Sequence, residues 1–249
     1  MSDIETRDVC IVGGGVAGLT AGIFTARAGL DTLILTSGEP ILARNAHLEN
    51  VPGFPAGVNA RTFLEMTQDQ AERNGCTVRE ASVTSVDPAD RERLSVSHAN
   101  QSDDARLLSD YVLCTSWSDT DYLAHLDEVG LIDRGSKTYV ETDDRGATDV
   151  DGLYAAGRIA ETHHQTVVAA GDGATAALSI VEDSEVPFYH DWVAPEGYFS
   201  GRDRDVPPGC EEIDEDERAE RERESMAVMQ EYFAEPVAEE PTQHPSVRD

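Results

Sequence analysis

The run VCIVGGGVAG at residues 9–18 decides the fold of this chain. Its first four residues are apolar and typical of a buried strand, and three consecutive glycines then force a tight turn. The helix predicted for 16–28 has an apolar stripe at helical spacing and ends at Gly29. The run TLILT at 32–36 is a second apolar strand. Strand, glycine turn, helix and strand in this order predict a right-handed parallel βαβ unit.

The turn contains Gly13, Gly15 and Gly18 at the spacing G-x-G-x-x-G. In such units the first glycine makes the turn, the second lets a pyrophosphate approach the backbone, and the third lets the helix pack against the strand. Free N–H groups at the helix start, at Val16 and Ala17, attract the diphosphate together with the helix dipole. Because the motif lies inside a βαβ unit, it predicts a dinucleotide-binding fold.

The end of the second strand is the expected place for a ribose. Many such units have an acidic residue there that binds a ribose hydroxyl. Here Thr36 and Ser37 occupy that place, and Glu39 lies slightly beyond. A hydroxyl accepts the same hydrogen bond more weakly, so Thr36 and Ser37 are candidate cofactor residues.

The charge of the chain excludes two classes of partner. Asp and Glu number 49 against 19 Lys and Arg, for a net charge of −30, and Lys137 is the single lysine. Nucleic acid and anionic membranes bind clustered cations, so we expect neither as a partner. Molar salt, with a Debye length of ~3 Å, would screen the self-repulsion of so acidic a chain. We expect an origin in an extreme halophile; the alternative is an acidic mesophilic protein with an acidic partner-binding tail.

Cysteine usage and apolar runs limit the remaining classes. The cysteines form no C-x-x-C pair, and their spacing indicates neither a metal site nor a disulfide framework. Residues 1–8 lack the positive start of a secretory signal, and no apolar run is long enough to span a bilayer. These features predict a soluble, cytoplasmic protein.

Composition divides the chain near residue 185. Residues 1–185 are expected to form one domain from two sequence halves, 1–116 and 138–185, and residues 186–249 an acidic appendage. The appendage has a predicted helix at about 211–233 and a disordered end from Ala234. We expect apolar residues of that helix to dock on the main domain or on a second copy in a homodimer: Met226, Val228, Met229, Tyr232 and Phe233. Further elements are expected at 60–74 (helix), 77–87, 94–98, 111–115, 138–141 and 152–156 (strands), and 165–181 (helix).

Three further stretches carry a family resemblance. ARNAHLENVPGFPAG (43–57), VETDDRGATDVDGLYAAGR (140–158) and HHQTVVAAGDGATAA (163–177) resemble the FAD-binding halves of thioredoxin-reductase-like flavoproteins. With residues 9–40, the resemblance covers most of 8–182. It implies FAD as the cofactor and an α/β fold, an FAD/NAD(P)-binding Rossmann-like parallel sheet with helices and a small β-meander.

Within that family, the returning half has the signature T-x-x-x-G-[LV]-[YF]-A-A-G-D, and the next helix begins against the flavin ring. Thr148 and 152–157 match the signature, and Gln165 and Thr166 match the helix start. The resemblance therefore implies that this helix end stabilises negative charge on the reduced flavin. The alternative is an ordinary helix start capped by Thr162.

The chain departs from the family in three ways. No second glycine motif lies between 111–115 and 152–157, so the NADPH domain is missing from this stretch, and the redox C-x-x-C of that domain is absent. Arg158 stands where the family has an aspartate that binds the ribityl chain, and 114–116 read Cys-Thr-Ser where the family has Ala-Thr-Gly. A protein of this type could not reduce thioredoxin with NADPH by itself. Arg158 either reaches a phosphate bidentately or marks a site that no longer binds FAD.

Together, the motif and the resemblance give the candidate cofactor residues Gly13, Gly15, Val16, Ala17, Gly18, Thr36, Ser37, Arg44, Asn45, Thr115, Gly157, Arg158, Gln165 and Thr166. Arg44 and Asn45 are included because their loop covers the flavin in related proteins. The catalytic candidates are His164, as a proton donor near reduced flavin, and Cys114, as a thiol at a strand end. The alternatives are a solvated histidine pair and a cysteine that packs as a small hydrophobe. Trp192, Tyr198 and Phe199 are expected either to cover a flavin face or to pack on the main domain.

The leading expectation is an FAD-dependent oxidoreductase, related to thioredoxin reductase, that takes electrons from a separate donor such as a ferredoxin, another reductase or a diffusible compound. One alternative is a non-catalytic nucleotide-binding or protein-interaction module on the same scaffold. Another is an NAD-binding enzyme that uses the glycine turn directly.

Overall fold

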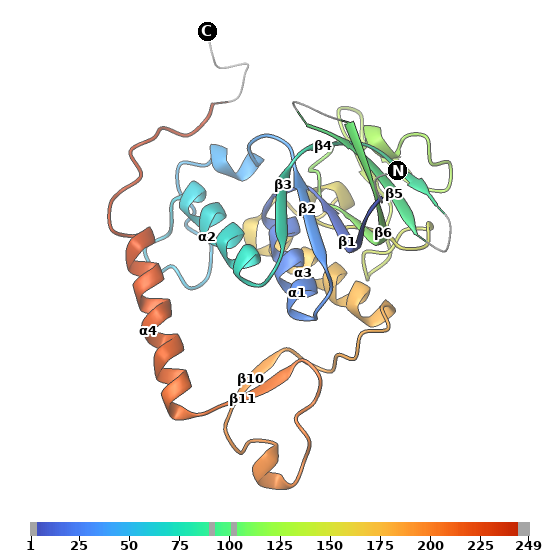
Figure 1. Cartoon of the computed structure of the whole chain (residues 1–249). Coiled ribbons are helices and arrows are strands. Elements are labelled where there is room, and N and C mark those ends of the chain that lie inside the picture. Colours follow the sequence, from blue (N-terminus) through green and yellow to red (C-terminus); the bar gives the residue numbers. More distant parts are fainter. Residues whose placement is uncertain (1–3, 90–92, 101–103, 244–249) are drawn as a thin grey trace.

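A computed structural model describes residues 4–89, 93–100 and 104–243 (Figure 1). Its main sheet has the strand order β3-β2-β1-β6-β5-β4, and β9 pairs with β6. The strands are β1 (Glu5–Val12), β2 (Thr32–Thr36), β3 (Thr77–Glu80), β4 (Ser82–Pro88), β5 (Leu94–Ala99), β6 (Asp104–Cys114) and β9 (Leu153–Ala155). β1 is parallel to both β2 and β6, whereas β4, β5 and β6 form an antiparallel meander. This arrangement confirms the predicted Rossmann-like α/β fold.

Two helices, α1 (Val16–Arg27) and α3 (Thr166–Asp183), pack side by side on one face of the sheet. Small residues let them approach closely, because a Cβ on Gly173 would lie 2.2 Å from the Ala17 carbonyl oxygen. The core beneath them includes fully buried side chains from the sheet and both helices: Ile11, Leu19, Ile34, Leu113 and Ile180. A third helix, α2 (Ala60–Arg73), contacts α1 on this side.

The opposite face of the sheet is covered by the connection between β6 and β9. This connection consists of a short 3-10 helix (Asp121–Leu123) and a hairpin of β7 (Leu131–Asp133) and β8 (Thr138–Val140). It buries Tyr122, Leu123, Leu126 and Val129 against the strands. A second nucleotide-binding domain would need on the order of a hundred residues, so residues 115–152 cannot contain one.

One expected strand is divided in the structure. Residues 77–87 form β3, which pairs with β2, and β4, which pairs with β5, and the chain turns between them at the buried Ala81. Thr and Val, which favour strands, occur throughout both segments. A local pattern therefore cannot show that the hydrogen-bonding neighbour changes.

The appendage contains two strands that the sequence did not predict. β10 (Trp192–Pro195) and β11 (Cys210–Ile213) pair in parallel, and the helix expected from 211 begins later as α4 (Glu215–Tyr232). The Asp214 carboxylate caps α4 by accepting a hydrogen bond from the Glu217 backbone N–H at 2.8 Å. This side-chain cap, together with the pairing of β11, sets the start of the helix. Of the end expected to be disordered, residues 244–249 lie outside the described residues.

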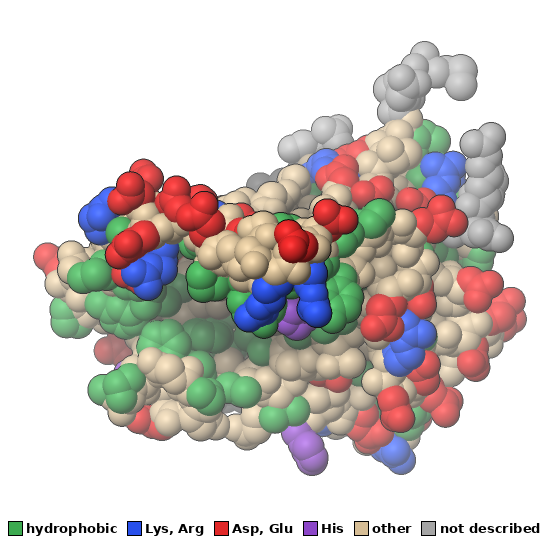
Figure 2. All heavy atoms as spheres, turned by 90° about the horizontal axis from the view of Figure 1, so that it is seen from below, with side chains coloured by type: hydrophobic (Ala, Val, Ile, Leu, Met, Phe, Trp, Pro, Cys, Tyr) green, Lys and Arg blue, Asp and Glu red, His purple; other side chains and the backbone are tan. Residues whose placement is uncertain are grey.

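Ion pairs join the appendage to α1 and to α2 of the main domain (Figure 1). Arg27, at the C-terminal end of α1, donates two hydrogen bonds to Asp191 at 2.5 and 2.6 Å. At the other attachment Glu224 of α4 pairs with Arg73 of α2 at 3.1 Å, and Phe233 contacts Phe54 with ring centroids 6.3 Å apart. The methionines of α4 remain exposed: Met226 and Met229. Figure 2 shows acidic side chains spread over the face that carries the appendage.

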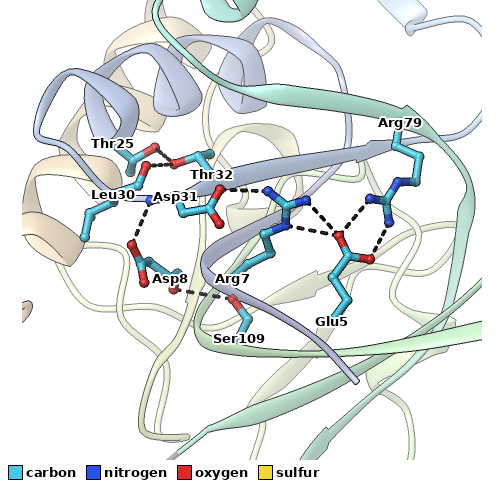
Figure 3. Close-up of polar contacts among 9 residues, drawn as sticks. All are labelled: Glu5, Arg7, Asp8, Thr25, Leu30, Asp31, Thr32, Arg79 and Ser109. Atoms are coloured by element: carbon cyan, nitrogen blue, oxygen red, sulfur yellow. Dashed lines mark hydrogen bonds and ion pairs between the residues drawn. The ribbon is translucent and has the colours of Figure 1, made fainter. Parts of the chain in front are cut away.

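Glu5 at the start of β1 lies between two guanidinium groups (Figure 3). It accepts hydrogen bonds from Arg7 at 2.8 Å and from Arg79 at 2.8 and 2.9 Å. The hydrogen bond from Arg79 is the largest influence on this carboxyl, and the pKa of Glu5 falls from 4.5 to about 2. A depressed pKa gives stability that is complete above pH 4.5 and is lost as the pH falls from 4.5 towards 2.

We therefore expect Glu5→Gln to lower the free energy of unfolding at pH 7 by about 1 kcal/mol, a small value because the side chain is partly exposed. Urea titrations at several pH values in 0.1 M salt measure the effect. The loss should shrink as the pH falls from 4.5 to 2. Glu128→Gln, at an exposed carboxylate without an ion pair among the described residues, is the control and should leave the profile unchanged. If the free energy of unfolding of Glu5→Gln depended on pH in the same way as that of Glu128→Gln, the prediction would be wrong.

His98 on β5 is buried at 4% exposure, and neither ring nitrogen has a hydrogen-bond partner within the described part of the chain. Burial, followed by the positive charge of Arg79, lowers the pKa of His98 from 6.5. A base with a lowered pKa is favoured in its neutral form by folding. Its contribution to stability is therefore complete above pH 6.5 and is lost as the pH falls below that value.

We expect His98→Leu to raise the free energy of unfolding by about 1 kcal/mol, because an apolar side chain removes two unsatisfied polar atoms. The gain should increase as the pH falls from 7 to 5. Thermal unfolding at these pH values measures it, and about 2–4 °C per kcal/mol is expected for a chain of this size. A gain that does not change with pH would show that titration of His98 is not its cause.

Candidate functional site

A cavity of about 610 Å³ opens where the parallel strands end. Val12 at the end of β1, Thr36 at the end of β2 and Thr115 after β6 line it, together with the N-terminal residues of α1 and α3. In parallel α/β sheets, ligands bind outside the carboxyl ends of the strands. The cavity therefore lies where this fold normally binds its ligand, and its volume is within the ~300–1,000 Å³ typical of small-molecule sites.

The glycine turn forms the floor of this cavity, and its three motif glycines have different surroundings. Gly13 has a φ of +119°, and a Cβ there would lie 2.7 Å from the Thr115 carbonyl oxygen. A Cβ on Gly18 would lie 2.0 Å from the Gly13 carbonyl oxygen. By contrast, a Cβ on Gly15 would meet nothing within 4 Å. The first and third glycines are thus needed for the fold, whereas Gly15 leaves open space beside the backbone for a ligand.

Both helices that open on the cavity begin without a side-chain cap. The N-cap of α1 is Gly15, and the N-cap of α3 is Gln165, whose side-chain oxygen instead accepts a hydrogen bond from Asn50 at 2.6 Å. Neither helix has an acidic residue in its first turn. Thr162, the alternative cap for α3, donates its hydroxyl to Asp172 at 2.7 Å. Two positive helix ends with unpaired N–H groups therefore face one cavity, which suits a ligand with two negative regions.

The β2 end of the cavity has the residues expected for a ribose. Thr36, Ser37 and Glu39 all line it, and the Ser37 hydroxyl hydrogen-bonds the Ser82 hydroxyl at 2.7 Å. A Cβ on Gly14 would lie 2.6 Å from the Thr36 hydroxyl oxygen, so Thr36 packs directly on the glycine turn. Thr36 and Ser37 thus lie in the cavity wall, and their contact with a ribose stays a prediction.

Arg158 lines the opposite end of the cavity. Its guanidinium lies over the Tyr139 ring, 4.8 Å from the centroid, and donates to the Tyr139 hydroxyl and to the Thr162 carbonyl oxygen at 3.2 Å. The preceding Gly157 does not line the cavity: its N–H donates to Asp172 at 2.5 Å, and its φ of +76° positions it against Ala17. Gly157 therefore shapes the turn, and Arg158 is held in the wall by neutral partners.

Most of the predicted cofactor residues come together here. The cavity is lined by Gly13, Gly15, Val16, Ala17, Thr36, Ser37, Thr115, Arg158, Gln165 and Thr166, and by the catalytic candidate His164. Four other candidates do not line it: Gly18, Arg44, Asn45 and Gly157. Gly18 packs beneath the turn, and the other three lie outside the wall. Their contacts with a cofactor stay predictions.

Cys114 is fully buried and does not line the cavity. Burial raises the pKa of its thiol to about 12, with a hydrogen bond from Tyr122 acting in the opposite direction. A thiol that stays protonated is a poor nucleophile and a poor redox group. The structure therefore favours the alternative interpretation of Cys114 as a small core residue.

The appendage aromatics do not reach the cavity. Trp192, Tyr198 and Phe199 pack on one another, with ring centroids 4.5–5.7 Å apart. Their segment is attached at Arg27, at the other end of α1 from the glycine turn, which for a helix of 12 residues is about 18 Å away. They belong to a separate cluster, and packing within the appendage explains them.

Trp117 is the main residue that the sequence analysis missed. It lines the cavity, has a φ of +62°, and contacts His164 edge-on with ring centroids 4.4 Å apart. A non-glycine residue with positive φ is strained, and such residues cluster at functional sites. Its position directly after the Thr115–Ser116 motif was the available signal. Tyr122, also in the wall, hydrogen-bonds Ser116 at 2.8 Å and was equally overlooked.

Residues 8–48 match the family of FAD binding domains. This match covers β1, the glycine turn, α1 and β2, which form the floor and the β2 end of the cavity. It indicates FAD as the cofactor, as the sequence predicts.

Curated relatives show the same likeness in sequence. Thioredoxin reductase of Streptomyces clavuligerus is 38% identical over 91 residues, which are 35% of this chain and 27% of that protein. Thioredoxin reductase of Aquifex aeolicus is 38% identical over 85 residues, or 33% and 26% of the two chains. The matched part thus spans about a quarter of the length of these relatives.

Solved structures show the same fold over a longer stretch. The thioredoxin reductase from Gloeobacter violaceus superposes with a TM-score of 0.64 at 20% identity, covering 73% of this chain and 96% of that chain. The Streptococcus pyogenes thioredoxin reductase gives 0.63 at 13% identity, covering 72% and 98%. Within the described residues, no helix combines the length and hydropathy required to cross a bilayer.

Proposed function

We propose that this chain is an FAD-dependent oxidoreductase, related to thioredoxin reductase, that takes its electrons from a separate donor. The observation that supports it best is the open space at Gly15, which lies between two uncapped helix ends on a cavity at the carboxyl ends of parallel strands. This is the chemistry required to hold a dinucleotide diphosphate on backbone N–H groups.

Different residues along the cavity would hold different parts of the dinucleotide. The N–H groups at the start of α1 would hold the diphosphate, and the hydroxyls of Thr36 and Ser37 would hold the adenosine ribose. Arg158, His164 and the N-terminus of α3 line the remaining wall and would contact the other half. FAD, when bound, supplies the electron-transfer chemistry, and the protein supplies orientation and electrostatics.

Two features of this wall suit redox chemistry. The positive end of the α3 dipole favours negative charge on the group bound there. His164 can hold or deliver a proton, because partial burial, followed by the charges of Arg158 and Lys137, lowers the pKa of its ring and makes the protonated form a better donor. Trp117 beside it lines this end of the cavity.

A separate donor is proposed because the described connection from 115 to 152 contains no second nucleotide-binding unit. The sequence has no C-x-x-C pair, and the three buried thiols, at Cys10, Cys76 and Cys114, have raised pKa values. A ferredoxin, another reductase or a diffusible reductant would therefore supply the electrons. We also propose that the protein is a shortened form of its relatives, cytoplasmic, and from an extreme halophile, as the net charge of −30 suggests.

Purification in molar KCl tests the proposal. We expect yellow protein, or apoprotein that FAD restores to about one equivalent of flavin, and bound flavin that accepts electrons from a reduced ferredoxin. Protein that FAD cannot reconstitute would support the alternative, a non-catalytic module on this scaffold. Thermal stabilisation by NAD but not by FAD would indicate an NAD enzyme. Either result would overturn the proposed function.

A further inference from the structure

Two cations lie at the α3 end of the cavity: Arg158 lines its wall, and Lys137 contacts the wall residue Trp117. Arg158 has only neutral hydrogen-bond partners, on Tyr139 and Thr162. The ammonium of Lys137 lies 5.3 Å from the centroid of the Trp117 ring. Neither cation has a carboxylate within ion-pair distance among the described residues, although the chain has 49 acidic residues and 19 Lys and Arg. Two unpaired cations at one place are notable in so acidic a protein.

The pKa of His164 is sensitive to the charge of these two cations. Its ring lies edge-on against Trp117, 4.4 Å between centroids, and the two charged groups that act on it are Arg158 and Lys137. Three carboxylates also line the cavity: Glu39 follows β2, and Asp119, two residues after Trp117, accepts a hydrogen bond from the backbone N–H of Asp121 at 3.2 Å. None of the three is among the charges that act on His164, so its ring lies in the positive field of Arg158 and Lys137.

The direction of the dinucleotide determines which part meets these cations. The hydroxyls of Thr36 and Ser37 at the end of β2 would hold the adenosine ribose. The N–H groups at the start of α1 would hold the diphosphate. Arg158, Trp117 and His164 line the wall that would remain for the redox-active half.

We propose that Arg158 and Lys137 stabilise the negative charge that the flavin carries after reduction, so that this protein binds reduced FAD more tightly than oxidised FAD. This inference rests on the proposed function. Oxidised flavin is neutral, and two electrons and one proton from an external reductant convert it to an anion. A cation near the ring interacts more strongly with the anion, and this differential affinity shifts the equilibrium towards the reduced form. In the flavoproteins that the chain resembles, an aspartate stands in place of Arg158, so a negative charge is replaced by a positive one.

The ratio of the dissociation constants of oxidised and reduced FAD tests the proposal. Binding titrations of oxidised FAD, combined with the midpoint potential of bound flavin against a reference dye in dithionite titrations, give this ratio without any turnover. We expect Arg158→Gln and Lys137→Gln each to lower it by about five- to tenfold at 0.1 M salt. Arg158→Lys retains the charge and should keep most of the ratio.

The matched control is Arg134→Gln. Like Lys137, Arg134 lies in the β7–β8 hairpin and outside the cavity lining, but Glu161 neutralises it through hydrogen bonds at 2.8 and 3.1 Å. We expect its ratio to equal that of the unmodified protein. Should Arg158→Gln lose FAD altogether, Lys137→Gln decides alone, because no hydrogen bond of the Lys137 side chain is broken.

The outcomes separate this inference from the proposed function. Bound FAD with an unaltered ratio in Lys137→Gln, and in Arg158→Gln where that variant binds FAD, would overturn the inference and leave the oxidoreductase proposal standing. Failure of the unmodified protein to bind FAD would overturn the proposed function, and this inference with it.

Discussion

We expect Gly15→Asp to weaken FAD binding by at least about 100-fold and to leave the fold intact. Gly15 is the N-cap of α1 with extended backbone at φ −81°, and a Cβ there meets nothing within 4 Å, so aspartate fits without strain. As an N-cap, aspartate differs from glycine by only a few tenths of a kcal/mol. Its carboxylate, however, would occupy the N–H groups meant for the diphosphate and repel it. At about 4 Å this repulsion is ~1–4 kcal/mol, which with the lost helix-end site amounts to an affinity at least about 100-fold weaker.

The measurement is flavin content after reconstitution, alongside the melting temperature of the apoprotein. The matched control is Gly201→Asp, the same substitution at a glycine of the appendage that also has open space around it. The control should bind FAD normally, and both variants should melt within a degree or two of the unmodified chain. Normal flavin content in Gly15→Asp would contradict the assignment of the diphosphate to this turn.

Gly173→Ala should strongly destabilise the fold. Gly173 is buried where α3 crosses α1, and its added Cβ would lie 2.2 Å from the Ala17 carbonyl oxygen and 2.8 Å from the carbonyl carbon. Backbone atoms cannot rotate away, so the two helices must separate. Overpacking of this kind costs about 3 kcal/mol, which corresponds to about 10 °C in melting temperature for a chain of this size.

The same substitution two residues earlier should have the opposite effect on the free energy of unfolding. Gly171 is on the exposed side of α3, and a Cβ there meets nothing within 4 Å. Gly171→Ala should therefore stabilise the protein by about 0.5–1 kcal/mol through helix propensity alone. Thermal and urea unfolding measure both variants. Equal effects at the two positions would show that α1 and α3 do not pack as closely as the structure indicates.

Local sequence patterns predicted the central elements because these depend on short-range physics. β2, α1 and α3 lie where periodicity and the glycine turn placed them, within two residues at each end, whereas β1 begins at Glu5, four residues before the expected start at Val9. The division of 77–87 into β3 and β4, and the pairing of β10 with β11, were missed. Strand pairing is decided by segments distant in sequence, and no local period contains that information.

For the candidate site, the sequence by itself determined the glycine turn, the hydroxyl residues after β2 and the start of α3, since each motif carries its own backbone chemistry. Only the tertiary structure decided that Trp117 and His164 meet, that Arg158 is held by Tyr139, and that Cys114 is buried. These relations join residues up to several tens of positions apart, and their geometry exists only once α3 packs on α1 and the 115–152 connection covers the sheet. The same holds for charge: composition determines the acidity of the whole chain, whereas only folding brings Arg158 into the cavity wall and Lys137 against the wall residue Trp117.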